Sequence, residues 1–194
     1  NWLFAKQFEQ RYPSINVQDD KIIVDEGPLC SCGGAFSFTT FMIYLIEKLL
    51  GHQEAVMASK ILMINTHEDS QLAFSVFRYQ HDHADESIKS VQEFIETHYQ
   101  QSILLEKLAA DYHMSVRNFI RRFRQATGNT PLEYLQRVRI EAAKKLLENT
   151  RESIENVALQ CGYEDISFFR KIFRRQVNMS PKEYHLKYGK LKVG

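Results

Sequence analysis

The sequence predicts a mostly α-helical fold: a C-terminal domain of seven helices, preceded by a smaller segment of mixed α/β character. Two observations predict the helical domain. From Ser87 onward, apolar residues such as Ile88 and Val91 recur at helical spacing, and no strand period is seen. One pattern also occurs twice, as FIRRFR at 119–124 and as FRKIFR at 169–174, each followed by a turn, a proline and a tyrosine.

Length and composition are those of a globular protein. The chain has 194 residues, of which 44% are hydrophobic and 12% aromatic. We see no apolar run of the roughly 20 residues that a membrane span needs, and no leader pattern at the start. Three cysteines give no disulfide framework, so we expect a protein of the reducing cytoplasm. Because the chain starts at Asn1 and not at a methionine, we also expect further sequence upstream.

Charge divides the chain into two parts. Residues 1–84 hold 6 Lys/Arg against 10 Asp/Glu, whereas residues 85–194 hold 19 Lys/Arg against 14 Asp/Glu. The polar stretch HDHADES lies at this boundary, and we expect it to be a solvated linker. The predicted domain organisation is therefore an α/β segment at 1–80, a linker at 81–87 and a helical domain at 88–194.

The first 80 residues alternate between helix and strand patterns. The expected order is a helix at 3–12, strands at 14–17 and 21–25 around an acidic turn, a Gly-punctuated loop at 27–38, and helices at 38–51 and 53–64. So few strands cannot form a doubly wound sheet. We therefore expect the C-terminal part of an α/β domain whose first half is absent.

The repeated pattern in the second part predicts two helix-turn-helix units. Phe119 and Phe169 are 50 positions apart, as are the prolines Pro131 and Pro181. Each proline follows a Thr or Ser that can cap a helix, and the helix after Pro131 is expected to run to Glu148. A helix-turn-helix motif consists of a short helix, a tight turn and a second helix.

A helical wheel separates the second helix of each unit into an apolar and a basic face. The phenylalanines face the core, and the opposite faces carry Arg117, Asn118, Arg121, Arg124 and Gln125 in the first copy and Ser167, Lys171, Arg174 and Arg175 in the second, with Phe168 near the edge. Arg reads guanine and Asn or Gln reads adenine in the major groove, while Lys and Arg neutralise phosphates. For either helix alone, an ordinary solvent-exposed basic face is the alternative to a DNA-binding face. Because the same division into an apolar and a basic face occurs in both helices, DNA binding is favoured.

The stretch from Leu104 to Tyr188 resembles the DNA-binding domain of the AraC/XylS family of bacterial transcription regulators. The resemblance rests on RIEAAKKLL in the long helix, IENVALQCGYEDISFFRKIFRR and the closing SPKEY, with Asn178 and His185 as departures. It implies two units joined by a long helix that read adjacent major-groove segments. Carried over by position, the base-facing residues are Arg117, Asn118, Ile120, Arg121, Ser167, Phe168, Arg170 and Lys171, and Arg137 and Lys144 on the long helix are expected to contact phosphates.

The opening NW…F…RYP, the loop GPLCSCGGAFSF, the helix that ends at Gly51 and HQEAVMASKIL are similar to the C-terminal part of a DJ-1/PfpI-type, flavodoxin-like domain, with MASK at 57–60 and EDSQ at 68–71 as departures. One subgroup of these regulators carries this domain upstream. The resemblance implies a domain that senses a small nitrogenous metabolite and forms a homodimer. A hydrolase or amidase of the DJ-1/PfpI kind, with accessory DNA binding, is the alternative. Cys30 and Cys32 do not fit a nucleophile elbow, and partnering with His52 or His67 cannot be inferred, so we expect buried structural cysteines.

The sequence therefore predicts a cytoplasmic regulator that binds double-stranded DNA at an asymmetric site, acts as an activator and is not an enzyme. RNA polymerase is the expected protein partner, and no membrane, cofactor or metal is expected. The pair His81 and His83 has metal-ligand spacing without an evident further ligand. A module that binds proteins through its helical repeat is a further alternative. Binding to DNA with a steep salt dependence would distinguish a DNA-binding protein from such a module.

Overall fold

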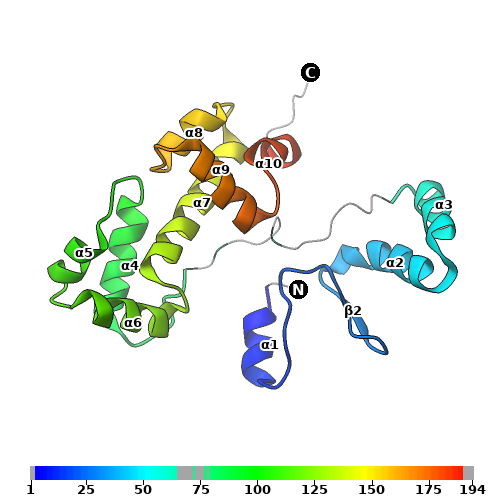
Figure 1. The fold of residues 1–194 in the computed structure, drawn as a ribbon, viewed down its shortest axis with the longest axis horizontal. Coiled ribbons are helices and arrows are strands. Elements are labelled where there is room, and N and C mark those ends of the chain that lie inside the picture. Colours follow the sequence, from blue (N-terminus) through cyan, green and yellow to red (C-terminus); the bar gives the residue numbers. More distant parts are fainter. Residues whose placement is uncertain (1–2, 65–71, 73–76, 78, 190–194) are drawn as a thin grey trace. The chain divides into compact units, whose positions relative to one another are not determined.

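A computed structural model describes residues 3–64, 72, 77 and 79–189 of the chain. The chain divides into two compact units, residues 1–75 and 76–194, which are treated separately below (Figure 1). In the part of the chain that the structure describes, no helix combines the length and the apolar character needed to cross a bilayer. His67 and the segment 68–71 lie outside the described residues.

The first unit contains one antiparallel hairpin and three α-helices among residues 3–64. Its elements are α1 (Ala5–Arg11), β1 (Ile23–Asp25), β2 (Cys30–Cys32), the short 3-10 turn η1 (Ala35–Ser37), α2 (Phe38–Leu50) and α3 (His52–Leu62). Val24 pairs with Ser31 in the hairpin. The helix predictions are confirmed, but the strand prediction at 14–17 is wrong: β1 pairs with 30–32, which the sequence predicted to be loop. A glycine turn at Gly27, where φ is +84°, brings these two strands together.

Very little apolar surface is buried within the first unit. Among residues 3–64, the buried hydrophobic residues are Ala5, Ile22, Ile43 and Ala55. Large apolar side chains lie on its surface instead, including Phe36, which is 87% exposed, and Met63, which is 92% exposed. Helices α2 and α3 form a hairpin through Gly51, whose φ of +119° favours glycine.

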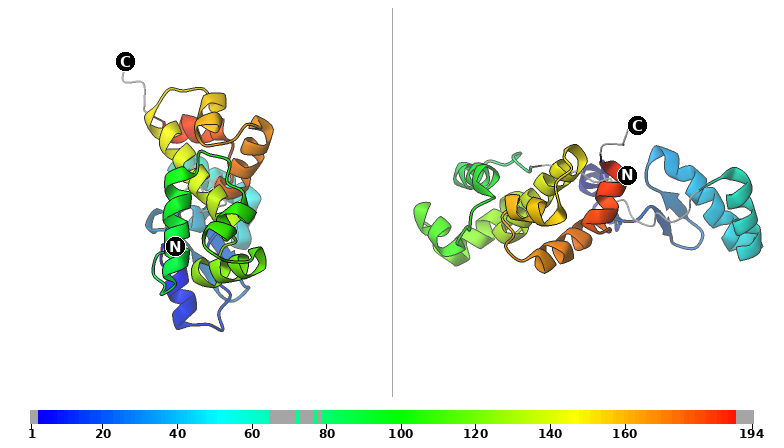
Figure 2. Two further views of the ribbon diagram at one scale, coloured as in Figure 1. Left: turned by 90° about the vertical axis from the view of Figure 1, so that its left-hand side faces the viewer. Right: turned by 90° about the horizontal axis from the view of Figure 1, so that it is seen from above.

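The second unit is helical throughout its described part. Between residues 79 and 189 it contains the seven expected helices: α4 (Glu86–His98), α5 (Leu105–Asp111), α6 (Val116–Thr127), α7 (Pro131–Asn149), α8 (Ile154–Gln160), α9 (Ile166–Val177) and α10 (Pro181–Tyr188). Helices α4, α5 and α6 gather at one end of α7, and α8, α9 and α10 gather at its other end (Figure 1). The right-hand view of Figure 2 shows the same order along the long helix.

Two separate hydrophobic cores lie along α7. The first is formed by α4, α5, α6 and the beginning of α7, and it includes Phe119, Phe123 and Tyr134. The second is formed by the rest of α7 with α8, α9 and α10, and it includes Phe169 and Phe173. Edge-to-face ring contacts recur in both, at 5.8 Å between the centroids of the first phenylalanine pair and 5.7 Å in the second. The sequence repeat is therefore a repeat of packing.

The predicted helix starts are confirmed by their caps. Thr130 and Ser180 each form a capping box with the glutamate three residues later, and a proline occupies the first turn in both cases. The second helix of each predicted helix-turn-helix unit, α6 or α9, is capped by Ser115 or Asp165, whose side chain accepts hydrogen bonds from backbone amides. These caps hold the first turn of each helix in place, and so they fix the direction in which its side chains point.

Within the second unit, the segment before α4 is packed against side chains of α4. The His83 imidazole lies 2.7 Å from the side-chain oxygen of Gln92, which is fully buried, and His81 lies 3.1 Å from the Glu96 carboxylate. The sequence reading of these histidines as solvated therefore differs from the structure. Helical periodicity within one segment carries no information about such long-range polar contacts.

Candidate nucleic-acid interface

Helix α6 has a buried aromatic face and an exposed basic face. Phe119 and Phe123 are 0% exposed and belong to the first core. Arg117, Arg121 and Arg124 lie on the exposed surface of the same helix. The arrangement follows from the helical period, which places residues three and four apart on one face. Arg122, although adjacent, faces elsewhere and pairs with Asp85.

The Arg121 side chain is held by two neighbours on its own helix. Its guanidinium donates to the side-chain oxygen of Asn118 at 2.8 Å and to that of Gln125 at 3.1 Å. All three residues were predicted from sequence to lie on the DNA-facing surface, and the structure brings them together. The bracing reduces the conformational freedom that Arg121 would lose on binding.

Helix α9 repeats the division with different polar residues. Phe169, Ile172 and Phe173 are buried, whereas the exposed residues are Ser167, Phe168, Arg170, Lys171, Arg174 and Arg175. Arg170 forms an ion pair with Glu155 at 2.8 Å, and the pair is more than half exposed. The partner of Arg175 is the Gln136 side chain on α7, at 3.0 Å.

Two apolar candidates lie at the borders of these faces. Phe168 is 44% exposed, and its ring centroid lies 6.3 Å from that of Tyr163. Ile120 is half-buried on α6. Both side chains present some apolar surface to the outside, which suits contact with a thymine methyl group.

The two phosphate-contact candidates on α7 differ in accessibility. Arg137 is exposed, with its guanidinium 5.5 Å from the ring centroid of Phe77. The side chain of Lys144 is only 5% exposed, and its ammonium lies 2.9 Å from the Glu141 carboxylate. Lys144 is therefore buried and not on the exposed surface, because α7 is packed by other helices on more than one side. We remove it from the proposed phosphate contacts.

An ion pair that the sequence did not predict connects α6 to the start of α4. Arg122 donates to both carboxylate oxygens of Asp85, at 2.6 and 2.9 Å. The guanidinium lowers the pKa of Asp85 below its ordinary value. The same carboxylate caps α4 through the amide of Ile88. The two partners are separated by 37 positions, so no local pattern could have indicated the pair.

Two tyrosine–glutamate hydrogen bonds occupy equivalent places in the two cores. Tyr134 donates to Glu96 and Tyr184 donates to Glu148, each at 2.5 Å. Burial, together with the neighbouring carboxylate, raises the pKa of both phenols. These contacts brace α7 and α10, the helices that follow α6 and α9. The repeated tyrosines were visible in the sequence, but their glutamate partners were not.

The first unit contains a polar cluster around the hairpin. Lys48 lies 2.6 Å from the Asp25 carboxylate, and Tyr44 donates a short hydrogen bond to the same carboxylate. These contacts lower the pKa of Asp25, with the lysine as the larger cause. Partial burial and the Asp25 carboxylate raise the pKa of the Cys30 thiol. A raised pKa makes the thiolate nucleophile less available.

The prediction that Cys30 and Cys32 are buried is wrong. Cys30 is half-buried and Cys32 is exposed on β2, so neither is the buried structural cysteine that the sequence suggested. The Cys30 thiol has Lys48, at 3.7 Å, as its hydrogen-bond partner, and His52 instead bonds to Glu47 at 2.9 Å. This arrangement gives no support to a Cys–His nucleophile.

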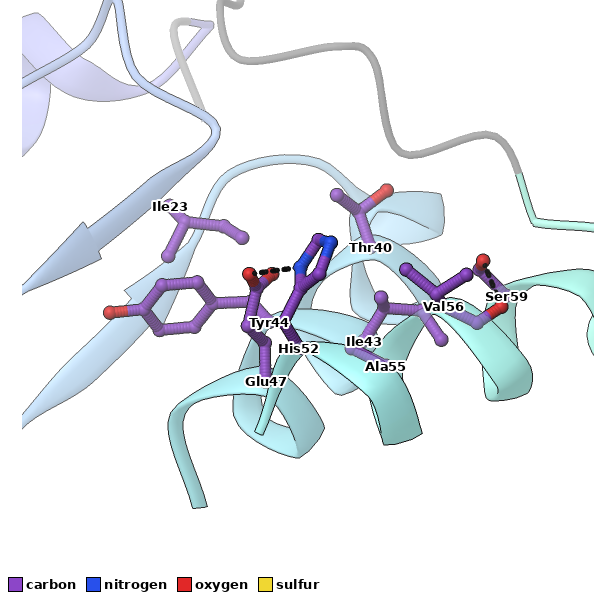
Figure 3. A pocket seen from close by; sticks show the side chains of 9 residues that line it. All are labelled: Ile23, Thr40, Ile43, Tyr44, Glu47, His52, Ala55, Val56 and Ser59. Carbon is purple, nitrogen blue, oxygen red and sulfur yellow. Dashed lines mark hydrogen bonds and ion pairs between the residues drawn. The ribbon is translucent and has the colours of Figure 1, made fainter. Parts of the chain in front are cut away.

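A small pocket of about 200 Å³ lies between the hairpin and helices α2 and α3 (Figure 3). Tyr44, Glu47 and His52 contribute its polar groups, and Ile23 and Val56 contribute apolar ones. Figure 3 shows the Glu47 and His52 side chains joined at one wall. The pocket could hold a small ligand with a cationic group, because a carboxylate and an aromatic ring both attract cations.

Comparison with known proteins places the second unit in a family. Residues 108–187 match a family model described as a helix-turn-helix domain. The HTH-type transcriptional activator RhaS of Klebsiella pneumoniae (strain 342) is 36% identical over 99 residues, which cover 51% of this chain and 36% of RhaS. RhaS of Enterobacter sp. (strain 638) is 34% identical over 99 residues. The chain thus spans about a third of the length of these curated relatives.

Solved structures give the same result. The DNA-binding domain of AdpA, a global transcriptional factor, in complex with a target DNA is 36% identical with a TM-score of 0.52, over 54% of this chain and 94% of that chain. A probable AraC family regulator from Rhodopseudomonas palustris CGA009 is 27% identical with a TM-score of 0.50, over 55% of this chain and 100% of that chain. Residues 108–187 are therefore a helix-turn-helix domain of the AraC/XylS family.

Proposed function

We propose that the protein is a sequence-specific DNA-binding transcription regulator whose helices α6 and α9 read two adjacent major-groove segments. The observation that carries the proposal is the paired arrangement of two capped helices, each with buried phenylalanines and exposed arginines, on one long helix. The AdpA domain, which is 36% identical to this chain, has been solved in complex with a target DNA. A helix fits the major groove, where arginine donates two hydrogen bonds to guanine.

The proposed DNA site is asymmetric. Helix α6 presents Arg117, Arg121 and two amide side chains, whereas α9 presents Ser167, Phe168 and Lys171. Amides and arginines favour adenine and guanine, while a phenyl ring favours contact with a thymine methyl group. Because the two faces differ, the two segments that they read should differ in sequence.

We propose that full engagement of both helices bends the DNA. Helix α7 has 19 residues. At about 1.5 Å per residue it is about 28 Å long, whereas adjacent major grooves on one side of the duplex are about 34 Å apart. Bending toward the protein shortens that separation. A permutation gel that shows no bend while both segments are protected would contradict this part of the proposal.

Selection of bound duplexes from a random pool, followed by footprinting, tests the proposed function. We expect one enriched site with two protected segments about one helical turn apart. Arg117→Ala with Arg121→Ala should remove protection of one segment, and Lys171→Ala should weaken the other. Failure of the pool to enrich any sequence, or binding with a shallow salt dependence, would reject sequence-specific recognition.

We further propose that the regulator is an activator that contacts RNA polymerase. RhaS relatives that share 32–36% identity with this region are described as transcriptional activators. Transcription from a template carrying the selected site, measured with purified polymerase, distinguishes activation from repression. Stimulation supports the proposal, and inhibition at the same occupancy contradicts it.

We propose that residues 1–80 are the C-terminal part of a DJ-1/PfpI-like α/β domain that senses a small nitrogenous metabolite and forms a homodimer. The exposed apolar side chains, such as Phe36 and Met63, support a larger domain or an oligomer that would cover them. The pocket at Tyr44 and Glu47 is the candidate effector site (Figure 3). Calorimetry with quaternary amines and amino acids, using Glu47→Gln as the comparison, tests the site, and sedimentation velocity tests the dimer.

A further inference from the structure

The two hydrophobic cores of the second unit meet at one residue of α7. Val138 is the last residue of α7 in the first core, and Ile140 is the first in the second core. Arg139 lies between them. Among the described residues, the two cores share no buried apolar residue. The orientation of one helix-turn-helix unit relative to the other therefore depends on α7 and on the polar contacts at this junction.

The Arg139 side chain joins α7 to the end of α4. Its Nε donates to the Tyr99 carbonyl at 2.7 Å, and its Nη2 donates to the Gln101 carbonyl at 2.9 Å. Tyr99 is the C-terminal cap of α4, where the helix dipole places partial negative charge, and Gln101 lies in the turn that follows. Hydrogen bonds from a charged donor to such acceptors are stronger than those between neutral groups.

The same guanidinium also contacts the second helix-turn-helix motif. It lies 5.2 Å from the ring centroid of Tyr163, which is 4% exposed between α8 and α9. Burial lowers the pKa of Arg139, although an arginine remains charged at any physiological pH. One side chain therefore bridges the end of α4 and the turn of the second helix-turn-helix motif.

Gly162 shows how closely these segments approach. A β-carbon at this position would lie 2.7 Å from the Gln100 carbonyl oxygen and 2.9 Å from Nη2 of Arg139. Its φ of +80° also favours glycine. The α8–α9 turn thus lies directly against the chain that follows α4, with the Arg139 guanidinium beside both.

We infer that Arg139 is the positioning residue that fixes the second helix-turn-helix unit relative to the first, and thereby sets the spacing between the two DNA segments. The effect on DNA rests on the proposed function, whereas the effect on the two units does not. Without the guanidinium, α7 and the contact between Arg175 and Gln136 still connect the units. A single helix bends more easily than a helix clamped to its neighbours.

A distance measurement without DNA tests the inference directly. In the full chain with Cys30 and Cys32 replaced by serine, spin labels at positions 107 and 182, on α5 and α10, report the separation of the two units. We expect Arg139→Ala to broaden the distance distribution, while Lys145→Ala, which removes an exposed cation from the same helix, leaves it unchanged. A distribution in Arg139→Ala as narrow as that of the parent would overturn the inference.

Binding to duplexes of altered spacing tests the consequence for DNA. One base pair inserted between the two selected segments should weaken parent binding about tenfold or more, because it rotates and displaces one groove relative to the other. Arg139→Ala should lose less than about threefold on the same insertion, since its units can adjust. Retention of the parent's spacing dependence by Arg139→Ala would contradict the assignment.

Arg139→Lys provides a second variant if the alanine variant unfolds. Lysine keeps the positive charge but lacks the planar fork that reaches two carbonyls. It should give intermediate broadening and intermediate spacing tolerance, and a fully parental result for both would reject a role for the fork. If the labels report broadening but the parent binds no specific DNA, the proposed function fails and the inference about the junction stands.

Discussion

The sharpest prediction concerns Arg121→Ala in helix α6. Arg121 is exposed, and its guanidinium is already directed by the side chains of Asn118 and Gln125. An arginine held in this way can donate two parallel hydrogen bonds to one guanine with little further loss of side-chain entropy. Its replacement removes the proposed base contact and leaves the buried core untouched, because the core side chains of α6 lie on the opposite face.

The expected loss follows from the value of one bidentate base contact. Such a contact contributes about 1–3 kcal/mol of discrimination, which corresponds to about 5- to 150-fold in affinity for the selected site. The Asn118 and Gln125 amides are freed by the substitution and can still donate to a base. We therefore expect preference at one base position to be relaxed and not reversed, with a loss near tenfold.

Parallel titrations of the selected duplex and a random duplex at several salt concentrations measure this effect. Arg121→Ala should weaken the selected duplex far more than the random one. Arg137→Ala removes the same charge from a proposed phosphate contact, so it should weaken both duplexes equally and reduce the salt slope by about one. Equal losses on both duplexes for Arg121→Ala would refute its assignment as a base-reading residue.

Three further outcomes are expected. Thr130→Ala should destabilise the second unit by about 1 kcal/mol in urea unfolding. The backbone amide and the hydroxyl of Thr130 both lower the pKa of Glu133, and alanine removes only the hydroxyl. The hydroxyl's part of this stabilisation is present above the ordinary glutamate pKa and lost as the pH falls below it, so the variant should show a slightly flatter acid limb. Lys144→Met should leave affinity for random DNA within about twofold, whereas Arg137→Ala lowers it; a comparable loss in both would restore Lys144 as a phosphate contact. Asn178 ends α9 with a φ of +59°, a conformation that favours glycine, and α6 ends at a glycine in the equivalent place. Asn178→Gly should therefore raise the free energy of unfolding by up to about 1 kcal/mol and leave DNA affinity unchanged. A lower free energy of unfolding would contradict this reason.

The sequence was most informative where structure depends on local pattern. Helical periodicity predicted all seven helices between residues 79 and 189, and the Ser/Thr–Pro pairs predicted the starts of α7 and α10. These features are set within a few residues, by hydrogen bonds between a cap and the first turn. The basic faces of α6 and α9 were likewise predictable, because buried phenylalanines fix the rotation of each helix.

Other features depend on partners distant in sequence. The strand pattern at 14–17 resembles a true strand, but pairing between β1 and β2 is decided by the turn at Gly27. Lys144 lies on the polar side of an isolated helix, yet neighbouring helices cover it and Glu141 neutralises it. The contact between Arg122 and Asp85 has no local signature either. Each of these required knowledge of which elements pack together.

The structural repeat extends beyond the phenylalanine–arginine pattern of α6 and α9 that reveals it in the sequence. Tyr134 of α7 bonds to Glu96 of α4, and Tyr184 of α10 bonds to Glu148 near the end of α7. The beginning of α7 thus closes the first helix-turn-helix core as α10 closes the second core. The end of α7 has the same place in the second core as α4 has in the first. Because the two helix-turn-helix units share a helix, no loop between them can absorb an insertion. The length of α7 and the contacts of Arg139 set the separation of the two helix-turn-helix units. Substitutions on the outer faces of α6 and α9 should therefore change which bases are preferred and leave the distance between the two DNA segments unchanged.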